Sequence, residues 1–463
     1  MLDLYDPHRS RFPTQRIGGT ARRREARHRE DFEAFCRPHF AALRAAGGAG
    51  LAFLSRETSS PSVAAMRGRL SEAFPRSRWH VWEPLNLDGQ REGARRAFGR
   101  DLRIRLRLDQ ADVIACFDAD LLGQYPDASR HARDWAAGRR SADQGRMNRL
   151  HVIESGYSLT GAAADHRLPA PPQTVARLAA ALAAALGVPG VAGLPLADAG
   201  EHAAWIERLA ADLAAHSGRA VVAAGPSQPP EVQVLCHAIN ARLDAFGRAV
   251  VPIEDPAAEP VLQTESLRSL VEAMAAGQVH TLVMLGGNPV YDAPADLDFA
   301  AALARVPTSI HLGLYEDETA RDCTWHLPQA HDLESWGDAR AWDGTIGPIQ
   351  PLIRPLYDGW PVIELLALLL DDPPDGEAIV RRTFASLLPA GDFETAWRRV
   401  LHDGFLEGSA SGAVDVELAA GAARTAAEDL LRRSAGAGGA GPAESMTIVF
   451  RGDARLYLSL IHI

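Results

Sequence analysis

The residues best suited to chemistry follow an apolar run in the second half of the chain. Leu282 to Leu285 has the composition of a buried strand and leads directly into Gly286, Gly287, Asn288 and Pro289. Glycines let a backbone approach a pyrophosphate, and Asn and Pro fix a turn. Open α/β sheets hold phosphate-bearing ligands where a strand ends in such a turn. The same four residues also suit an ordinary tight turn, so the motif alone leaves both interpretations open.

A second group of residues offers the side chains that bind zinc. Thiolates and imidazoles with a nearby carboxylate can form a zinc site, and these types occur at Cys323, His326, His331 and Glu334. Cys323 and His326 are an odd number of residues apart, so on a strand they would point to opposite faces. We therefore expect structural roles and no metal site, with a zinc site as the alternative.

Two aspartates follow another apolar run, which ends at Phe117. Asp118 and Asp120 could act as paired carboxylates, but we expect them to cap a helix or to bind the amides of the turn. Four tryptophans lie close together in the sequence, and we expect them to pack in a core or against a partner. Stacking on a pterin is the alternative for this set, Trp325, Trp336, Trp342 and Trp360.

Composition and charge exclude several classes of protein. The chain has 463 residues with 47% apolar content, enough for several domains with a large core. The 48 basic and 59 acidic residues give a net charge of -11, which argues against nucleic acid as a partner. Every one of the basic residues is arginine, so the chain has no Walker A lysine and no Schiff-base lysine.

The cysteines and the apolar segments add two further expectations. Cys36, Cys116, Cys236 and Cys323 are widely spaced and form no Cys-x-x-Cys pair, so no iron–sulfur cluster motif is recognisable. The leucine-rich run 362–370 is too short to cross a bilayer and contains a glutamate. We therefore expect no direct membrane span.

The order of apolar and amphipathic segments predicts the fold class. Strand-like and helix-like segments alternate, which is typical of an α/β fold with doubly wound, mostly parallel sheets. A Gly- and Pro-rich stretch, 187–195, suggests a linker between two Rossmann-like lobes. We expect an N-terminal arm and first lobe over 1–190 and a second lobe over 191–376. A short helical tail, with a linker and a truncated end, would follow over 377–463.

The two predicted lobes echo each other at matched positions. A strand ends at Asp118-Ala119-Asp120 in the first and at Gly287-Asn288-Pro289 in the second. A later Thr-to-Pro spacing is the same in both, from Thr160 to Pro169 and from Thr319 to Pro328. The matches predict two related nucleotide-fold halves, with coincidence as the alternative.

Taken together, these segments resemble a known family, the molybdopterin oxidoreductases. Residues 285–292 are similar to the loop that binds the guanine dinucleotide in that family, and 317–328 are similar to the strand and turn beyond it. Residues 334–338 and 343–355 resemble the cofactor-side loops that follow. The resemblance implies two doubly wound lobes of the molybdopterin oxidoreductase type.

A narrower resemblance rests on further segments, namely 4–7, 147–150, 154–155, 164–168 and 331–338. They are similar to the molybdopterin oxidoreductase-like half of the B subunit of bacterial alternative complex III, a quinol:electron-acceptor oxidoreductase. The resemblance covers roughly residues 2–405 and implies other subunits of a membrane-bound electron-transfer complex as partners. It also implies the periplasmic face of the cytoplasmic membrane and a chain truncated at both ends, with iron–sulfur clusters only in a missing C-terminal half.

The resemblance also sets the expectations for cofactors. An active relative needs a Cys, selenocysteine, Ser or Asp metal ligand ahead of the strand at Val113, and 79–99 contains neither Cys nor Ser. Asp88 is the one candidate there. We therefore expect a scaffold with no cofactor, no metal and no catalytic residue. A vestigial cofactor site would remain at Gly286, Gly287, Asn288, Pro289, Glu334 and Asp338.

Two alternatives remain open from the sequence. In the first, the chain is an active oxidoreductase that binds bis-molybdopterin guanine dinucleotide. Asn288 and the Gly286-Gly287 amides would then hold a phosphate or guanine, with Glu334 and Asp338 nearby. In the second, the chain is a plain nucleotide-binding module. Its single Gly-x-Gly-x-x-Gly, at 436–441, has no strand before it, which disfavours that class.

Overall fold

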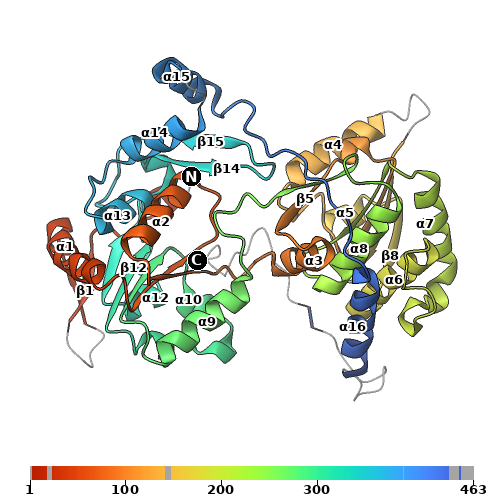
Figure 1. The fold of residues 1–463 in the computed structure, drawn as a ribbon, viewed down its shortest axis with the longest axis horizontal. Coiled ribbons are helices and arrows are strands. Elements are labelled where there is room, and N and C mark those ends of the chain that lie inside the picture. Colours follow the sequence, from red (N-terminus) through yellow and green to blue (C-terminus); the bar gives the residue numbers. More distant parts are fainter. Residues whose placement is uncertain (1–2, 18–22, 141–146, 389–390, 437–447, 450–463) are drawn as a thin grey trace. The chain divides into compact units, whose positions relative to one another are not determined.

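The computed structural model describes residues 3–17, 23–140, 147–388, 391–436 and 448–449, which fold into two compact units (Figure 1). Unit 1 combines Met1–Asn86 with Pro256–Ala410, and unit 2 combines Leu87–Asp255 with Ser411–Ile463. Each unit therefore contains two separate stretches of the chain. This division differs from the contiguous lobes expected over 1–190 and 191–376 and from a separate tail over 377–463.

Unit 1 is built on a sheet of seven strands within the described residues. Five neighbouring strands are parallel, and β1 extends the sheet beyond them by pairing with β13 in the antiparallel direction. The order is β2 (Arg24–Ala26), β1 (Thr14–Arg16), β13 (Trp325–Pro328), β12 (Thr308–Gly313), β11 (Thr281–Leu285), β3 (Leu51–Ser55) and β4 (Arg78–Val81).

Alternate residues of the central strands face two different cores. Phe53 and Val283 point into a core formed with α1 (Arg29–Ala45), α2 (Pro61–Ala73) and α13 (Val362–Leu369). Leu54 and Met284 point into a core formed with α9 (Gln263–Ala275) and α11 (Phe299–Leu303). Helices on both faces explain why strands β3 and β11 are buried throughout and mostly apolar.

The last elements of unit 1 pack around Trp336 and Trp397. α14 (Gly376–Leu387) and α15 (Phe393–Asp403) lie where a helical tail was expected, and a hairpin of β14 (Gly337–Arg340) and β15 (Ile346–Ile349) lies nearby in sequence. Trp397 packs on Phe384 and Trp336. Trp325 and Trp360 are also buried in this unit, where both contact Phe32.

Unit 2 is built on a parallel sheet of four strands within the described residues. Its order is β8 (His166–Pro169), β7 (Arg149–Glu154), β6 (Val113–Phe117) and β9 (Ala220–Ala224). A separate antiparallel pair joins β5 (Leu102–Leu106) to β10 (Val250–Glu254). The helices of this unit are α3 (Asp88–Phe98), α4 (Ala128–Arg140), α6 (Pro172–Ala185), α7 (Ala203–Ala215), α8 (Pro230–Arg242) and α16 (Ala422–Gly436).

The two sheets share one topology. The order β8-β7-β6-β9 in unit 2 matches β13-β12-β11-β3 in unit 1, and all of these strands are parallel. A short helix follows each of the corresponding strands β7 and β12, namely α5 (Leu159–Ala162) and α12 (Glu318–Asp322). The two expected doubly wound lobes are therefore confirmed and share one strand order, although β3 precedes β11 in the chain whereas β9 follows β6. Whether the two halves are related stays a prediction.

The remaining short elements are α10 (Pro289–Asp292) and several 3-10 turns, namely η1 (Asp3–Tyr5), η2 (Leu108–Gln110), η4 (Pro195–Ala197), η5 (Gly200–His202), η6 (Ala295–Leu297) and η7 (Asp332–Glu334). No helix in the described ranges has both the length and the apolar composition needed to span a bilayer.

Candidate functional site

The Gly-Gly-Asn-Pro turn lies directly after β11, as predicted. Gly286 and Gly287 have φ angles of 78° and 79°, in the left-handed region where glycine is favoured, and Pro289 begins α10. The Gly286 amide donates to the carbonyl of Leu312 at 2.9 Å. A Cβ atom added to Gly286 would lie 3.4 Å from Cδ of Arg56, so the stem of that side chain runs beside the turn.

The side chain of Asn288 ties this turn to α12. Its Oδ1 accepts hydrogen bonds from the amide of Thr319 at 3.1 Å and from Oγ1 of Thr319 at 2.7 Å. Its Nδ2 donates to Glu318 at 2.7 Å, a bond that lowers the pKa of Glu318. Thr319 Oγ1 accepts in turn from the Val290 amide at 3.0 Å. Both ends of the Asn288 amide are thus bound to the protein itself.

The matching turn of unit 2 has the same hydrogen bonds, but an aspartate stands where unit 1 has Asn288. Asp120 accepts from the amide of Thr160 at 3.0 Å and from its Oγ1 at 2.7 Å, and Thr160 Oγ1 accepts from the Leu122 amide at 2.9 Å. Asp118, with a φ of 50°, accepts from the Ser155 amide at 2.7 Å. The two aspartates bind turn amides, as the sequence predicted.

The carboxyl edge of the unit 2 sheet is filled by acidic side chains. Glu154 ends β7 where Gly313 ends β12, and it accepts hydrogen bonds from Arg167 at 2.6 Å and from Ser158 at 2.5 Å. A Cβ atom on Gly161 would lie 1.9 Å from Oε1 of Glu154, so the carboxylate packs directly against this glycine. Together with Asp118, Glu154 makes this edge unfavourable for phosphate, whereas the unit 1 edge presents glycines.

Glu334 was expected beside the cofactor loop, but its partners are internal. Arg9 donates to both carboxylate oxygens, at 3.2 and 2.7 Å, and the side chains of this pair are 2% and 1% exposed. The amides of Leu356 and His331 also donate to Glu334, at 2.9 and 2.8 Å. Burial would raise the pKa of Glu334, but these hydrogen bonds hold it below its usual value.

Asp338 has a structural role at the start of α2. Its carboxylate accepts from the hydroxyls of Ser60 and Ser62 and from the Ser62 amide at 3.1 Å. Asp338 is buried, and Ser60 in turn caps α2 by accepting from the Val63 amide at 3.1 Å. Helix caps of this kind satisfy amides that have no partner within the helix. The structure therefore places Asp338 at a helix N-terminus and leaves it bound to that helix.

The four candidate zinc ligands are not brought together. Cys323 ends α12 instead of lying on β13, so the alternation argument does not apply to it, and burial raises its pKa to about 12. His331 lies 3.4 Å from Asp3, and Glu334 binds Arg9. Among the residues that the structure describes, no three His, Cys, Asp or Glu side chains are grouped so that they could hold a metal ion.

The histidines behind the turn were missed as a pair by the sequence analysis. His311 on β12 and His326 on β13 are register partners in adjacent parallel strands, and both are fully buried. Their rings stack with centroids 5.3 Å apart, and His311 Nε2 lies 3.0 Å from the carbonyl oxygen of Gly287. Sequence gave no register between the two strands, so nothing indicated this contact.

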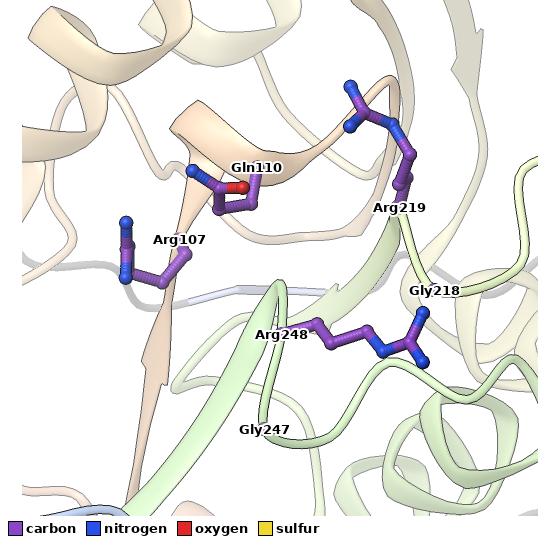
Figure 2. A pocket seen from close by; sticks show the side chains of 6 residues that line it. All are labelled: Arg107, Gln110, Gly218, Arg219, Gly247 and Arg248. Carbon is purple, nitrogen blue, oxygen red and sulfur yellow. The ribbon is translucent and has the colours of Figure 1, made fainter.

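A shallow concavity of about 520 Å³ lies elsewhere in unit 2 (Figure 2). It is at the opposite end of the sheet from Asp118, because Arg219 immediately precedes β9. Arg219 makes two hydrogen bonds to Asp112, Arg107 makes two to Asp109, and the guanidinium groups of Arg107 and Arg248 point to opposite sides. The three arginines do not converge on a single point.

Comparisons with known proteins support the fold alone. No protein-family model matches the chain, and no curated protein matches it. Among solved structures, the chain is similar to acetylene hydratase from Pelobacter acetylenicus, with a TM-score of 0.60 and 14% identity. The match covers 80% of this chain and 62% of that protein, so this chain spans less than two thirds of its length. The similarity, with the parallel sheets, supports a molybdopterin oxidoreductase-like α/β fold.

The residues present do not fit a pair of guanine dinucleotide cofactors. The unit 1 turn could admit a phosphate beside Gly287, but Asn288, Glu334 and Asp338 are bound to the protein itself. The equivalent edge of unit 2 carries carboxylates, which would repel a phosphate.

Proposed function

We propose that this chain is a cofactor-free scaffold domain of a bacterial quinol:electron-acceptor oxidoreductase complex, with a molybdopterin oxidoreductase-like fold. The observation that carries the proposal is that the side chains of the candidate cofactor-binding residues are already hydrogen-bonded within the protein. Asn288, Glu334 and Asp338 each use their side chains to hold the fold together. A side chain that is fully hydrogen-bonded inside the protein would have to break those bonds to bind a ligand.

The proposed partners are an iron–sulfur half and neighbouring subunits at the periplasmic face of the cytoplasmic membrane. This part of the proposal rests on the segments that resemble the complex III subunit, such as 331–338. Burial of the four cysteines is consistent with it. Their thiols have raised pKa values, and a buried thiol of that kind is a poor ligand for a cluster or metal.

An active oxidoreductase that binds bis-molybdopterin guanine dinucleotide is the second candidate. It is favoured by the backbone at the turn, because the Gly287 and Asn288 amides donate to no acceptor among the described residues. Free amides beside a glycine turn can bind a phosphate. The two candidates differ in whether the turn must stay open for the complex to work.

The substitution Gly286→Asp separates these candidates. It places at the unit 1 turn the residue that unit 2 has at the same position, Asp118, where an aspartate with positive φ is accommodated. The added carboxylate would repel a cofactor phosphate. A strain that lacks this protein would be complemented with the wild-type or the variant chain, and quinol oxidation by its membranes would be measured with the molybdenum and tungsten content of the purified protein.

For a scaffold we expect no stoichiometric metal in either protein and equal quinol oxidation. Stoichiometric molybdenum or tungsten in the wild type, lost together with activity in the variant, would overturn the proposal in favour of the enzyme. Deletion of the chain with no effect on quinol oxidation would overturn both candidates. Gly68→Ala, in the middle of α2 with open space around the added Cβ, is the control for expression.

A further inference from the structure

A continuous chain of hydrogen bonds joins the N-terminal segment to the glycine turn. Ser10 Oγ lies 2.6 Å from Nε2 of His326, and Nδ1 of His326 lies 3.2 Å from Nδ1 of His311. Nε2 of His311 lies 3.0 Å from the carbonyl oxygen of Gly287. The Ser10 amide also donates to the carbonyl of Leu314 at 2.8 Å. The chain therefore runs from Ser10 through two buried rings to the turn.

The Gly287 carbonyl, at the end of these hydrogen bonds, determines which ring nitrogens carry a proton. A carbonyl oxygen only accepts, so His311 Nε2 must carry a proton. In a neutral ring His311 Nδ1 is then an acceptor, which requires the proton of His326 on Nδ1. The Nε2 atom of His326 is left as an acceptor, and Ser10 donates to it. This tautomer set satisfies all three contacts with both rings neutral.

We propose that Ser10, His326 and His311 form a pH-sensitive latch that holds the Gly286-Gly287 turn while at least one ring is neutral and releases it on further acidification. The latch stands whether or not the turn binds a cofactor. Because a trans peptide directs its C=O and N–H to opposite sides, His311 also turns the Asn288 amide away from the rings. The latch thus determines which way that amide points.

Protonation disturbs the latch in two steps. A first proton can be accepted if the central bond reverses, so that His311 donates from Nδ1, His326 donates from Nε2 and the Ser10 hydroxyl accepts. A second proton places N–H groups on both Nδ1 atoms, which lie 3.2 Å apart, and the central hydrogen bond is lost. Two donors facing each other in a dry core strongly disfavour that state.

Burial opposes protonation of both rings, whereas the charged groups around them act in both directions. Arg24 on β2 faces both histidines and disfavours a further positive charge, although it is itself paired with Glu316 at 3.2 Å. Asp317, which caps α12, faces His311 and favours its charged form. Burial is the larger cause, and it lowers the pKa of both histidines, that of His326 well below its usual value.

Nitrogen-15 NMR of the histidine side chains tests the tautomers in the full-length protein. At about pH 8 we expect the His326 proton on Nδ1, the less common form, and the His311 proton on Nε2. The signals would be assigned from His311→Gln and His326→Asn, made one at a time. Both protons on Nε2 in the wild-type protein would overturn the latch, and this reading does not require the variants to be stable.

Hydrogen exchange tests the release of the turn. After correction for the intrinsic rate, peptides that contain 8–16 and 284–290 should exchange at least about tenfold faster at pH 5 than at pH 8. In the doubly substituted protein, His311→Gln with His326→Asn, the corrected exchange rates of these peptides should be the same at pH 5 and pH 8. Equal protection of the wild-type peptides at the two pH values would overturn the proposal.

His80→Gln is the matched control for this experiment. His80 is another buried histidine of unit 1, and its Nδ1 lies 2.8 Å from the Ser266 carbonyl, away from the latch. Burial lowers the pKa of His80 as well. The control should therefore change the pH dependence of overall stability and leave the pH dependence of exchange at 284–290 unchanged. Loss of that dependence in His80→Gln would show that general acid unfolding opens the turn and would overturn the latch.

Discussion

Arg9 and Glu334 form a buried ion pair although they lie 325 positions apart in the chain. The substitution Glu334→Gln keeps the shape of the side chain and leaves the Arg9 guanidinium without its countercharge. Breaking a buried pair by removing one charge costs about 3–5 kcal/mol of unfolding free energy. Chemical denaturation of unit 1 should show a loss of that order, and a loss below about 1 kcal/mol would contradict the structural role.

An exposed pair on α1 provides the control. Glu33 lies one helical turn from Arg29, at 3.2 Å, and both side chains are partly exposed. Such pairs contribute about 0.3–0.5 kcal/mol, so Glu33→Gln should have little effect. The Glu334 carboxylate has a lowered pKa, so its contribution is present at neutral pH and is lost as the pH falls through that lowered pKa. The Glu334→Gln variant should lack this loss.

Sequence could place Glu334 in a family motif but could not supply its partner. Arg9 lies in an Arg-rich N-terminal arm whose composition predicts a solvated segment, and only the fold brings it to Glu334. Asp338 was misplaced for the same reason, since Ser60 and Ser62 precede it by more than half the chain. Long-range hydrogen bonds of this kind leave no periodic signal in a single sequence.

At the level of elements, the turns after β6 and β11 are closed by the same hydrogen bonds, which a threonine donates to an aspartate or asparagine side chain. The sequence indicated this repeat through the matched Thr160 and Thr319, because side-chain types at turns are set by local geometry. It could not reveal that Asp118 and Gly286 occupy the same left-handed position, which sets the charge of each edge. The difference in charge between the two sheet edges becomes visible only when the two turns are compared in the structure.

Replacement of Gly286 by alanine tests the strain at the unit 1 turn. With a φ of 78°, an added Cβ costs about 1–2 kcal/mol, and it would also press on the Arg56 stem at 3.4 Å. Gly68→Ala, in α2 with no atom within 4 Å of the new Cβ, should instead stabilise unit 1 by about 0.5–1 kcal/mol. Thermal unfolding of both variants should give opposite signs, and a neutral Gly286→Ala would show that the turn is not held in this conformation.

At the level of the whole molecule, each unit has its own core. Leu182 on α6 is fully buried in unit 2, and Leu366 on α13 is fully buried in unit 1. Truncation of a buried leucine to alanine costs about 2–5 kcal/mol. We expect calorimetry to resolve two transitions, with Leu182→Ala lowering one midpoint and Leu366→Ala the other. A single transition lowered equally by both would contradict separate cores.

The α/β class was predictable from the alternation of strands and helices, but the partition of strands between units was not. The strand at Leu51 was expected in the first lobe and pairs with Thr281 of unit 1, whereas the strand at Ala220 was expected in the second lobe and pairs with β6. Both are short apolar runs with the same composition as their neighbours. Nothing in such a run specifies which edge it joins.

The interrupted sequence of unit 1 has a consequence for its synthesis. β3 cannot complete its hydrogen bonds until β11 is made, because Leu51 pairs with a residue 230 positions later. At translation rates of about 5–20 residues per second, this apolar strand waits roughly ten to fifty seconds for its neighbour. During that wait most of unit 2 leaves the ribosome and can fold. We therefore expect a chaperone that binds extended apolar segments to protect nascent β3 during this interval.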